Sequence, residues 1–338
     1  MCAILDFATY TICAMAKAES QQIPTLFGFL LLDDFTHLSM SSAIETLRVA
    51  NCVAGSQAFR WRMISRDGGP VTASDGLSIN TDFGIGDETR SSPLSAIVVC
   101  GGQGVEFFSA KPVLRWLRAS SRRGIAVGSI STGGYVLAKA GLLDGYRCSI
   151  HWENSAALAL EFPSISVSSS VYTIDRDRFT SSGGTAPMDM MLYFVRRLMG
   201  PETSARVSEH FIHDRIRDTK GWEHEPLSQV VGAQSTKLAA AVELMESNIR
   251  EPFSQAEMAS YVGLSRRQVQ RLFKRYLQCS PSHYYLQLRL ERARQLLFQT
   301  DLRIVEISAQ TGFGSSSHFI ACYKELYGNT PRADRATR

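Results

Sequence analysis

The sequence lacks the features of a secreted, membrane-spanning or zinc-stabilised protein. Its seven cysteines are an odd number, are scattered along the chain and form no Cys-x-x-Cys pair, which argues against a disulfide scaffold or a zinc ribbon. No run of 18 apolar residues is present, so no transmembrane helix is expected. Residues 1–24 lack a basic start and a long apolar block, and we interpret them as an N-terminal tail rather than a signal peptide. These absences favour a cytoplasmic protein with no membrane partner.

The composition is that of an ordinary globular protein, but the charge is distributed unevenly. Apolar residues make up 44% and charged residues 20% of the 338 residues, and two domains are the natural expectation for this length. Residues 237–338 contain 15 Lys and Arg against 9 Asp and Glu, a net charge of +6, whereas the first 236 residues have a net charge of −2. A basic C-terminal third predicts a module that binds nucleic acid or a membrane surface.

Strand and helix signals alternate up to residue 200. Short apolar runs such as residues 26–32 and 96–100 end at acidic residues or glycines, which is typical of buried strands. This alternation predicts an α/β fold, a flavodoxin-like doubly wound parallel sheet with helices on both faces. Strands are expected at residues 26–32, 60–65, 96–100, 124–129, 165–170 and 172–175, and helices at residues 41–53, 112–120, 132–140, 187–199 and 202–218.

The pattern changes after residue 200. One helix is expected there, and the polar residues 219–236 have no periodicity, so we interpret them as a linker. Beyond the linker the sequence predicts only helices. The expected organisation is therefore a tail at 1–24, an α/β domain at 25–200, a helix and linker at 201–236 and an all-α domain at 237–338.

Residues 253–277, FSQAEMASYVGLSRRQVQRLFKRYL, contain the clearest motif. Ser254 and Glu257 have the spacing of a capping box at the start of a short helix. Gly263 supplies a turn, and Ser265 begins a second helix. A short helix, a glycine turn and a basic helix are typical of a helix-turn-helix unit, whose second helix enters the major groove, where arginine reads guanine and glutamine reads adenine. The polar face of that second helix carries Arg266, Arg267, Gln270, Arg271 and Lys274.

The same arrangement recurs about fifty residues later. A short helix at 304–310, a turn at 311–314 and a helix at 316–327 are expected. The long helix that begins at Pro281 has a continuous apolar face and would hold the two reading helices apart, as successive major grooves about 34 Å apart require. The alternative is an all-α bundle with a solvated basic face, but two glycine-turned helix pairs in tandem favour DNA binding.

Residues 237–331 resemble the AraC-type DNA-binding domain. The resemblance rests on GLSRRQVQRLFKRYL, RLERARQLL and IVEISAQTGFGSSSHFIACYKELYGNTP. Members of that family usually have an aromatic residue three positions after the final proline, where this chain has Asp334, and this departure predicts a frayed last turn. The resemblance implies a double-stranded DNA operator as partner, with one groove faced by Arg266, Arg267, Gln268, Gln270 and Arg271 and the next by Ser315, Ser316, Ser317 and His318.

Residues 129–133, SISTG, lie at a predicted strand-to-helix junction. A sharp turn there would lift Ser131 above the sheet, as in a nucleophile elbow. Thr132 would offer its backbone N–H at a helix start, which suits an anion or an oxyanion. Gly102, at the end of the preceding strand of the sheet, would bring a further N–H group close.

His151, in the motif HWEN, follows a predicted strand and is a candidate base for Ser131, with Glu45 as a possible third group. These residues leave open a hydrolase of the amidase or peptidase kind. Residues 25–199 resemble the class I glutamine-amidotransferase-like fold, PfpI branch, through FGFLLLDDF, SAIETLRVAN, VVCGGQG, SISTGGYVLAKAGLLDG, HWEN and SGGTAPMDMML. Catalytic members have a cysteine where this chain has Ser131. Because serine attacks only with a well-oriented base, we expect a degenerate elbow, no catalytic residue and no cofactor.

One further group of polar residues is a candidate metal site. His210, His213 and Asp214 have the i, i+3, i+4 spacing of ligands on one helix face. The sequence offers no fourth ligand beside them. We therefore expect no metal site.

The whole chain resembles AraC-type regulators with an amidotransferase-like sensor domain. DGYRCSIHWEN and SGGTAPMDMML resemble the members that sense choline-derived metabolites such as glycine betaine and carnitine, although arginine-sensing regulators share the architecture. The resemblance implies an activator of catabolic genes that works as a homodimer with RNA polymerase. The elbow would hold the effector carboxylate, and Trp152 with a nearby carboxylate would hold the ammonium group by cation–π and charge attraction. The expected contacts are Ser131, Thr132, Gly102, Glu45, His151, Trp152 and Glu153.

Overall fold

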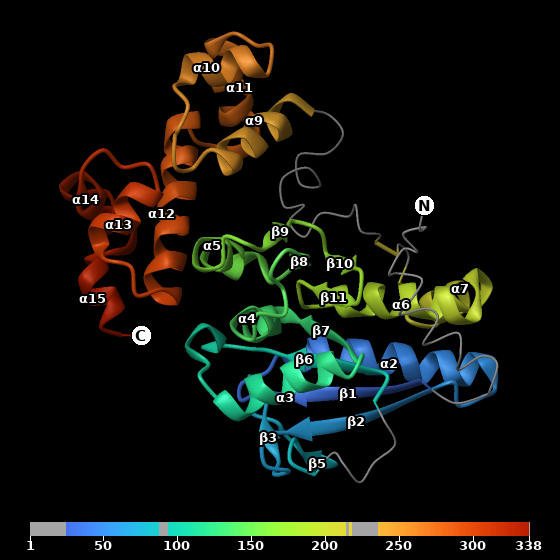
Figure 1. Ribbon diagram of the computed structural model, residues 1–338. Coiled ribbons are helices and arrows are strands. Elements are labelled where there is room, and N and C mark those ends of the chain that lie inside the picture. Colours follow the sequence, from blue (N-terminus) through green and yellow to red (C-terminus); the bar gives the residue numbers. More distant parts are fainter. Residues whose placement is uncertain (1–24, 88–93, 214–215, 218–235, 338) are drawn as a thin grey trace, which may run out of the picture. The chain divides into compact units, whose positions relative to one another are not determined.

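The computed structural model describes residues 25–87, 94–213, 216–217 and 236–337. These residues form two compact units, which lie within residues 1–223 and 224–338. The first unit is α/β and the second contains only helices among its described residues (Figure 1). None of the described helices is long and apolar enough to cross a membrane.

The described part of the first unit contains a seven-stranded sheet. Its middle strands are the apolar runs that the sequence predicts, and they are buried along their whole length because helices cover both faces. All neighbouring strands pair in parallel except the first two in the order, which are antiparallel. A two-residue turn joins these two strands, and such a turn is too short for a parallel crossover. The sheet, which we expected to be all-parallel, therefore has an antiparallel edge strand. The strand order is β10 (Tyr172–Asp175), β11 (Arg178–Ser181), β7 (Ala126–Ile130), β6 (Ala96–Cys100), β1 (Thr25–Leu31), β2 (Phe59–Ser65) and β5 (Phe83–Gly84).

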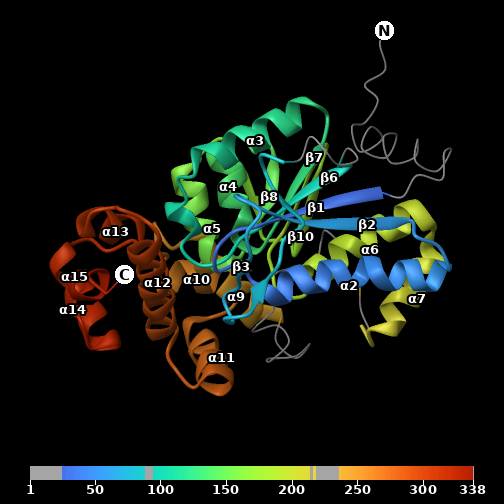
Figure 2. The same cartoon turned by 90° about the horizontal axis from the view of Figure 1, so that it is seen from below.

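Helices cover both faces of this sheet, as the alternating pattern predicts (Figure 2). Their apolar residues pack on the strands: Ala43, Leu47 and Ala50 of the first helix are fully buried. The doubly wound α/β prediction is therefore confirmed. One face is covered by α2 (His37–Ala54), α6 (Ala186–Met199) and α7 (Pro201–His210), and the other by α3 (Lys111–Arg122) and α4 (Gly134–Lys139).

Short elements complete the first unit, and the sequence pattern missed most of them. They have two or three residues per strand, which is too short for a periodicity to register. The predicted helix at 132–140 begins instead with a 3-10 turn, and the predicted strand at 165–170 is shorter. These elements are the antiparallel pair β3 (Val71–Thr72) and β4 (Ser78–Ile79), the parallel pair β8 (Arg147–Ser149) and β9 (Ser166–Ser168), the helix α5 (Trp152–Glu161), and the turns η2 (Val105–Phe107) and η3 (Ser131–Gly133).

The helix predicted at 202–218 was placed too long. It ends at His210 as α7, because the chain then turns through Ile212 with a left-handed φ of 53°. The Ser208 hydroxyl donates to the His213 carbonyl at 2.8 Å and fixes this turn. The predicted linker at 219–236 and the tail at 1–24 lie outside the described residues, except for Thr236.

The second unit has its own apolar core. The first three helices pack around Phe273 and Leu238, both almost completely buried. The long helix buries Leu290, Ala293 and Leu297 of the predicted stripe. In order, the helices are α9 (Thr236–Ser247), α10 (Gln255–Tyr261), α11 (Arg266–Leu277), α12 (Pro281–Gln299), α13 (Ile304–Gln310), α14 (Ser316–Tyr327) and α15 (Pro331–Arg335).

The prediction that Asp334 leaves the last turn frayed is wrong. Residues Pro331–Arg335 form α15, and the Asp334 side chain is only 6% exposed. Its carboxylate accepts a hydrogen bond of 2.9 Å from the Tyr323 hydroxyl. A buried hydrogen bond therefore fastens α15 to α14.

Candidate functional site

Both helix-turn-helix units have well-formed helix starts. In the first helix-turn-helix pair, Ser254 and Glu257 make a reciprocal capping box before α10, and Ser265 and Gln268 make another before α11. Gly263 joins the two helices with φ +65°, a conformation that favours glycine. The predicted boundaries of this motif are confirmed to within a residue or two.

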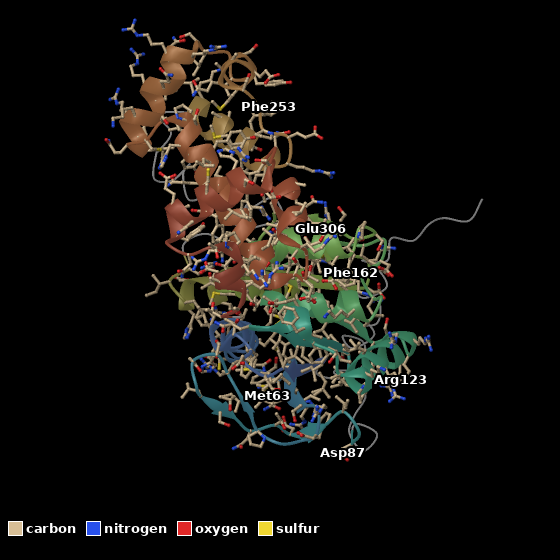
Figure 3. All side chains as sticks on the ribbon, turned by 90° about the vertical axis from the view of Figure 1, so that its left-hand side faces the viewer. Met63, Asp87, Arg123, Phe162, Phe253 and Glu306 are labelled. Carbon is tan, nitrogen blue, oxygen red and sulfur yellow. The ribbon has the colours of Figure 1, made fainter. Side chains whose placement is uncertain are left out.

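One face of α11 is buried and the other is exposed. Val269 and Phe273 point into the core. The Gln268 side-chain oxygen accepts from the Ser265 backbone N–H at 2.7 Å, so this glutamine is engaged in the cap. Nitrogen-tipped side chains project outward from the orange part of the ribbon in Figure 3. All the predicted reading residues of this helix are exposed: Arg266, Arg267, Gln268, Gln270, Arg271 and Lys274.

The second helix-turn-helix pair is hydrogen-bonded to the long helix α12. Arg289 of α12 donates to the carbonyls of Thr311 and Gly312 at 2.8 and 2.7 Å and stacks on the Phe313 ring. The turn before α14 is thereby fixed to α12. Ser315 caps α14 by accepting from the His318 N–H. Of the predicted reading residues, Ser315, Ser317 and His318 are exposed and Ser316 is half-buried.

Ser131 adopts the predicted elbow in the first unit. It follows β7 directly as the first residue of the η3 turn, with φ +57°, a rare conformation for a side-chain-bearing residue. The side chain is 4% exposed, and its hydroxyl lies 3.1 Å from that of Thr36, at the start of α2. Thr132, also buried, donates to the Gly102 carbonyl at 2.6 Å.

The His151 ring makes no hydrogen bond to the Ser131 hydroxyl in the part of the chain that the structure describes. Among the described residues, the hydroxyl of Ser131 pairs with Thr36, and only the His151 backbone N–H reaches Ser131, donating to its carbonyl at 3.4 Å. The ring lies 5.8 Å from the Trp152 ring and 3.7 Å from the Glu153 carboxylate, at the start of α5. Burial lowers the pKa of His151 below its ordinary value, which the nearby Glu153 partly offsets.

Glu45 lies away from the elbow, contrary to its expected place. It is nine residues beyond Thr36 on the same helix, about 13 Å along the axis. Its carboxylate is 44% exposed and forms an ion pair with Arg48 at 2.7 Å. The hydrogen bond from Arg48 lowers the pKa of Glu45, so the carboxylate is ionised.

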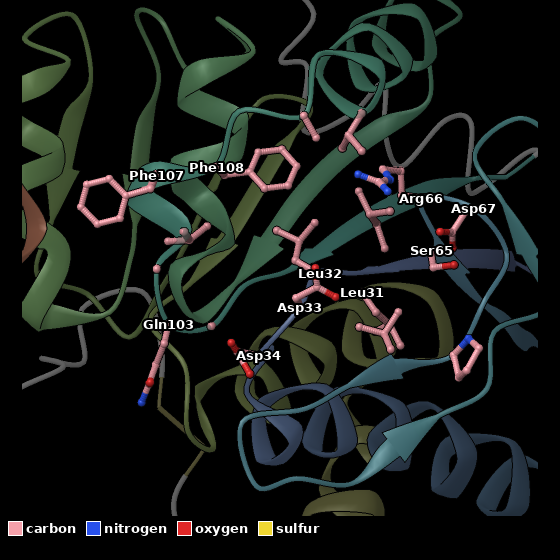
Figure 4. A pocket seen from close by; sticks show the side chains of 18 residues that line it. Leu31, Leu32, Asp33, Asp34, Ser65, Arg66, Asp67, Gln103, Phe107 and Phe108 are labelled. Carbon is pink, nitrogen blue, oxygen red and sulfur yellow. The ribbon is translucent and has the colours of Figure 1, made fainter. Parts of the chain in front are cut away.

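A cavity of about 460 Å³ opens beside the elbow (Figure 4). It lies at the carboxyl ends of β1, β2 and β6, where the strand order reverses around β1, and such switch points are the usual ligand sites of open α/β sheets. Figure 4 places Phe108 and Arg66 above Leu32, and Asp33 and Asp34 below it. Further lining residues are Leu30, Leu31, Ser65, Asp67, Pro70, Val71, Gly102, Gln103, Gly104, Val105, Phe107, Ala110 and Val113.

Sequence reasoning missed most of this cavity. Of the seven predicted ligand contacts, Gly102 alone is among its lining residues, and Thr132, next to Ser131 in the chain, adjoins it through its hydrogen bond to the Gly102 carbonyl. Asp33 and Asp34 could have been found, because they follow directly on a buried strand and the carboxyl end of such a strand lines the switch point. Arg66 and Phe108 come from other segments and carry no local signal.

The metal-like spacing after α7 also has another explanation. His213 lies beyond the end of the helix, so it does not share a helical face with His210. Its ring lies 2.9 Å from the carboxylate of Asp189, which is completely buried on α6. No group of three metal-binding side chains occurs among the residues that the structure describes, and Asp214 lies outside them.

Known proteins match both units. Residues 28–197 match the DJ-1/PfpI family and residues 258–337 match a helix-turn-helix domain. The chain is 49% identical to the HTH-type transcriptional regulator GbdR of Pseudomonas aeruginosa, over 92% of this chain and 84% of that one. It is 40% identical to the HTH-type transcriptional regulator CdhR of the same species, over 92% and 91% of the two chains.

A solved structure supports the fold of the first unit. It is an AraC family transcriptional regulator from Pseudomonas putida, 32% identical, which covers 56% of this chain and all of that one with a TM-score of 0.50. The doubly wound sheet, the two helix-turn-helix units and these matches agree. This chain belongs to the AraC-family HTH-type transcriptional regulators that carry a DJ-1/PfpI domain at their N-terminal side.

Proposed function

We propose that this regulator activates catabolic genes when its N-terminal unit binds a choline-derived quaternary amine such as glycine betaine or carnitine. The observation that carries the DNA-binding role is the pair of helix-turn-helix units mounted on α12, each with a capped second helix. A helix of 19 residues spans about 28 Å. This length is comparable with the 34 Å between successive major grooves.

We assign the base contacts to the exposed face of α11 and to the first turn of α14. Arginine can bind guanine with two hydrogen bonds and glutamine can bind adenine. Gln268 and Ser315 are engaged in helix caps, so they support the reading turns rather than read bases. The base or phosphate contacts are Arg266, Arg267, Gln270, Arg271 and Lys274 in one groove and Ser316, Ser317 and His318 in the next.

The effector site is the cavity beside the elbow. Its volume suits a small metabolite. The carboxylates of Asp33 and Asp34 and the rings of Phe107 and Phe108 offer charge attraction and cation–π contact to a trimethylammonium group. Arg66 offers a two-point partner for a carboxylate. A betaine carries both groups on one small molecule.

The elbow supports this site without catalysing a reaction. Catalysis by a hydrolase using Ser131 and His151 would require a base at the serine hydroxyl, and that hydroxyl pairs with Thr36 instead. Replacing Ser131 by alanine discriminates the two functions: a regulator keeps DNA binding and changes only its effector affinity. Loss of amide turnover in S131A would favour the hydrolase. The expected effector contacts of His151, Trp152 and Glu153 stay predictions. Replacing each of these residues by alanine tests them through the same change in effector affinity.

Two partners complete the proposal. Activation requires contact with RNA polymerase at the promoter. A homodimer would place two reading units on a repeated operator, since the symmetry of a dimer matches paired half-sites.

Thermal unfolding of the purified chain tests the effector. The panel contains glycine betaine, dimethylglycine, carnitine, choline and arginine, and a specific binder stabilises the fold by about 2.7 kcal/mol at a hundred times its dissociation constant. We expect a shift with a methylated amine that Arg66→Gln abolishes. Arg60→Gln, exposed on the strand that precedes Arg66 and outside the cavity lining, keeps it. A flat response across the panel would contradict the effector assignment.

A further inference from the structure

A completely buried carboxylate holds the end of the first unit. Asp189 of α6 is 0% exposed. It accepts hydrogen bonds from the Arg217 backbone N–H at 2.8 Å and from the Arg217 guanidinium at 3.0 and 2.7 Å, and the His213 ring lies at 2.9 Å. A buried carboxylate is tolerated only when such partners compensate its lost hydration. The pairing of Asp189 with Arg217 is therefore strongly favoured as long as Asp189 stays buried.

Arg217 lies in the sequence between α7 of the sensor unit and the first helix of the DNA-binding unit. Arg217 follows α7 and is the last residue described before Thr236, where the DNA-binding unit begins its first helix. Asp189 belongs to α6, which packs on the sheet of the sensor unit. The pair thus fixes the segment that runs to the DNA-binding unit onto the body of the sensor unit.

The residues just before Asp189 touch the elbow. A side-chain carbon at Gly183 would lie 3.2 Å from the Cα, Cβ and hydroxyl of Ser131, and Gly183 itself has φ +115°, so glycine allows this close approach. Two residues later, the Thr185 hydroxyl accepts from the Arg217 guanidinium at 2.8 Å. Residues 183–189 therefore contact Ser131 at one end and Arg217 at the other.

The cavity joins this chain of contacts at Gly102. Its carbonyl accepts the Thr132 hydroxyl, beside Ser131, and Gly102 lines the cavity. A Cβ added at Gly183 would lie within 3.2 Å of Ser131, so the backbone at Gly183 lies close to the elbow. The Gly102 loop, the elbow and residues 183–189 are therefore neighbours in sequence or in space between the cavity and Arg217.

We propose that residues 183–189 couple effector occupancy to the DNA-binding unit through the Asp189–Arg217 pair. The proposal rests on the proposed function and names how that site is regulated. The element has two states, with Arg217 held or released. The effector shifts their populations only by binding one state more tightly than the other. Asp189 and Arg217 are positioning residues that touch neither effector nor DNA.

The test compares operator affinity with and without glycine betaine for the full chain, on DNA that the chain selects from a random pool. We expect betaine to change the wild-type dissociation constant by about fivefold or more, a typical coupling. In Arg217→Ala the change falls below about twofold, while betaine still binds with its wild-type affinity in calorimetry. Arg217→Lys keeps the charge without the planar fork and gives an intermediate change. Arg206→Ala, an exposed arginine of α7, keeps the wild-type change.

Three outcomes would overturn the proposal in distinguishable ways. A purely structural role for the pair predicts that R217A melts earlier but keeps the wild-type response to betaine, and this result would overturn the coupling alone. Loss of betaine binding in R217A would place Arg217 in the effector site and also overturn it. A wild-type chain whose operator affinity ignores betaine would overturn the proposed function, and the coupling with it.

Discussion

At the scale of single residues, the site is determined by which partner each polar group finds. Ser131 has the geometry of a nucleophile elbow, but its hydroxyl is paired with Thr36 and not with an imidazole. The same backbone that serves catalysis in a hydrolase here brings Ser131 against Gly183. Asp334 is a second case, because its buried carboxylate accepts a hydrogen bond from Tyr323.

The hydrogen bond between Tyr323 and Asp334 stabilises the second unit. Tyr323→Phe leaves the buried carboxylate without its partner, and we expect a loss of about 1–3 kcal/mol of unfolding free energy. Urea unfolding followed by circular dichroism measures it. Tyr261→Phe removes a hydroxyl from a side chain that is 65% exposed and should leave the midpoint unchanged. Equal effects of the two changes would contradict the buried bond.

His151 makes the stability of the first unit depend on pH. Because burial lowers the pKa of His151 in the folded chain, the unfolded chain takes up a proton first as the pH falls below about 6.5. Stability is therefore full above that pH and declines as the pH falls toward the folded pKa. Urea midpoints at pH 7.5 and 5.5 should differ less in His151→Gln than in the wild type. An unchanged difference would mean that His151 is not the group responsible.

At the scale of elements, short apolar strands and capped helices carry the fold. Each reading helix begins with a serine cap and presents its first turn outward, and α12 spaces the two units. Arg289 ties the second turn to α12 by two hydrogen bonds. The element that binds DNA is thus a rigid assembly rather than two independent helices.

The contribution of α11 is tested by Arg271→Ala. If Arg271 contacts a base, the change weakens operator binding by about 1–3 kcal/mol and relaxes the preference at one base pair. Fluorescence anisotropy at fixed salt measures the affinity. Arg250→Ala removes the same charge from an exposed position outside the reading helices and serves as the control. Equal losses in both variants would leave only a charge effect.

The sequence predicted the elements that have a strong local pattern. The runs that form β1, β6 and β7 are apolar and end at acidic residues, glycines or serine, and the capping boxes mark α10 and α11, so these boundaries follow within one or two residues. The two- and three-residue strands have no periodicity long enough to detect, and α5 begins without a side-chain cap that would mark its start. The α7 helix was overextended because its left-handed stop at Ile212 has no glycine to signal it.

The candidate site was predictable only where it is local. The elbow at Ser131 follows from a strand, a serine and a helix in succession. Thr36 reaches Ser131 across 95 positions of sequence and Arg217 reaches Asp189 across 28. Contacts between such separated residues depend on the packing of α2 and α6 on the sheet, which no local pattern specifies. Glu45 was misplaced for the same reason.

At the scale of the whole molecule, the chain combines a sensor unit with a DNA-binding unit, each with its own core. The net charge of −2 before residue 237 and +6 after it divides the two roles. The proposed function assigns DNA affinity to the basic unit and its control by the effector to the acidic one. The relatives that match over both units are transcriptional regulators.

The independence of the basic unit can be measured directly. A fragment of residues 237–338 contains almost the whole of the second core, so we expect it to fold and to bind the operator with no response to glycine betaine. Anisotropy titrations of the fragment and the full chain provide the comparison. Failure of the folded fragment to bind the operator would mean that the sensor unit contributes contacts of its own.

Transcription in a purified system tests the central claim most directly. The template carries the selected operator upstream of a promoter, and the reaction contains RNA polymerase, the full chain and either glycine betaine or buffer. We expect transcript to rise only when the chain and glycine betaine are both present, and the Arg66→Gln variant to abolish the rise. Equal transcript with and without glycine betaine, from a chain that still binds the operator, would contradict effector-dependent activation.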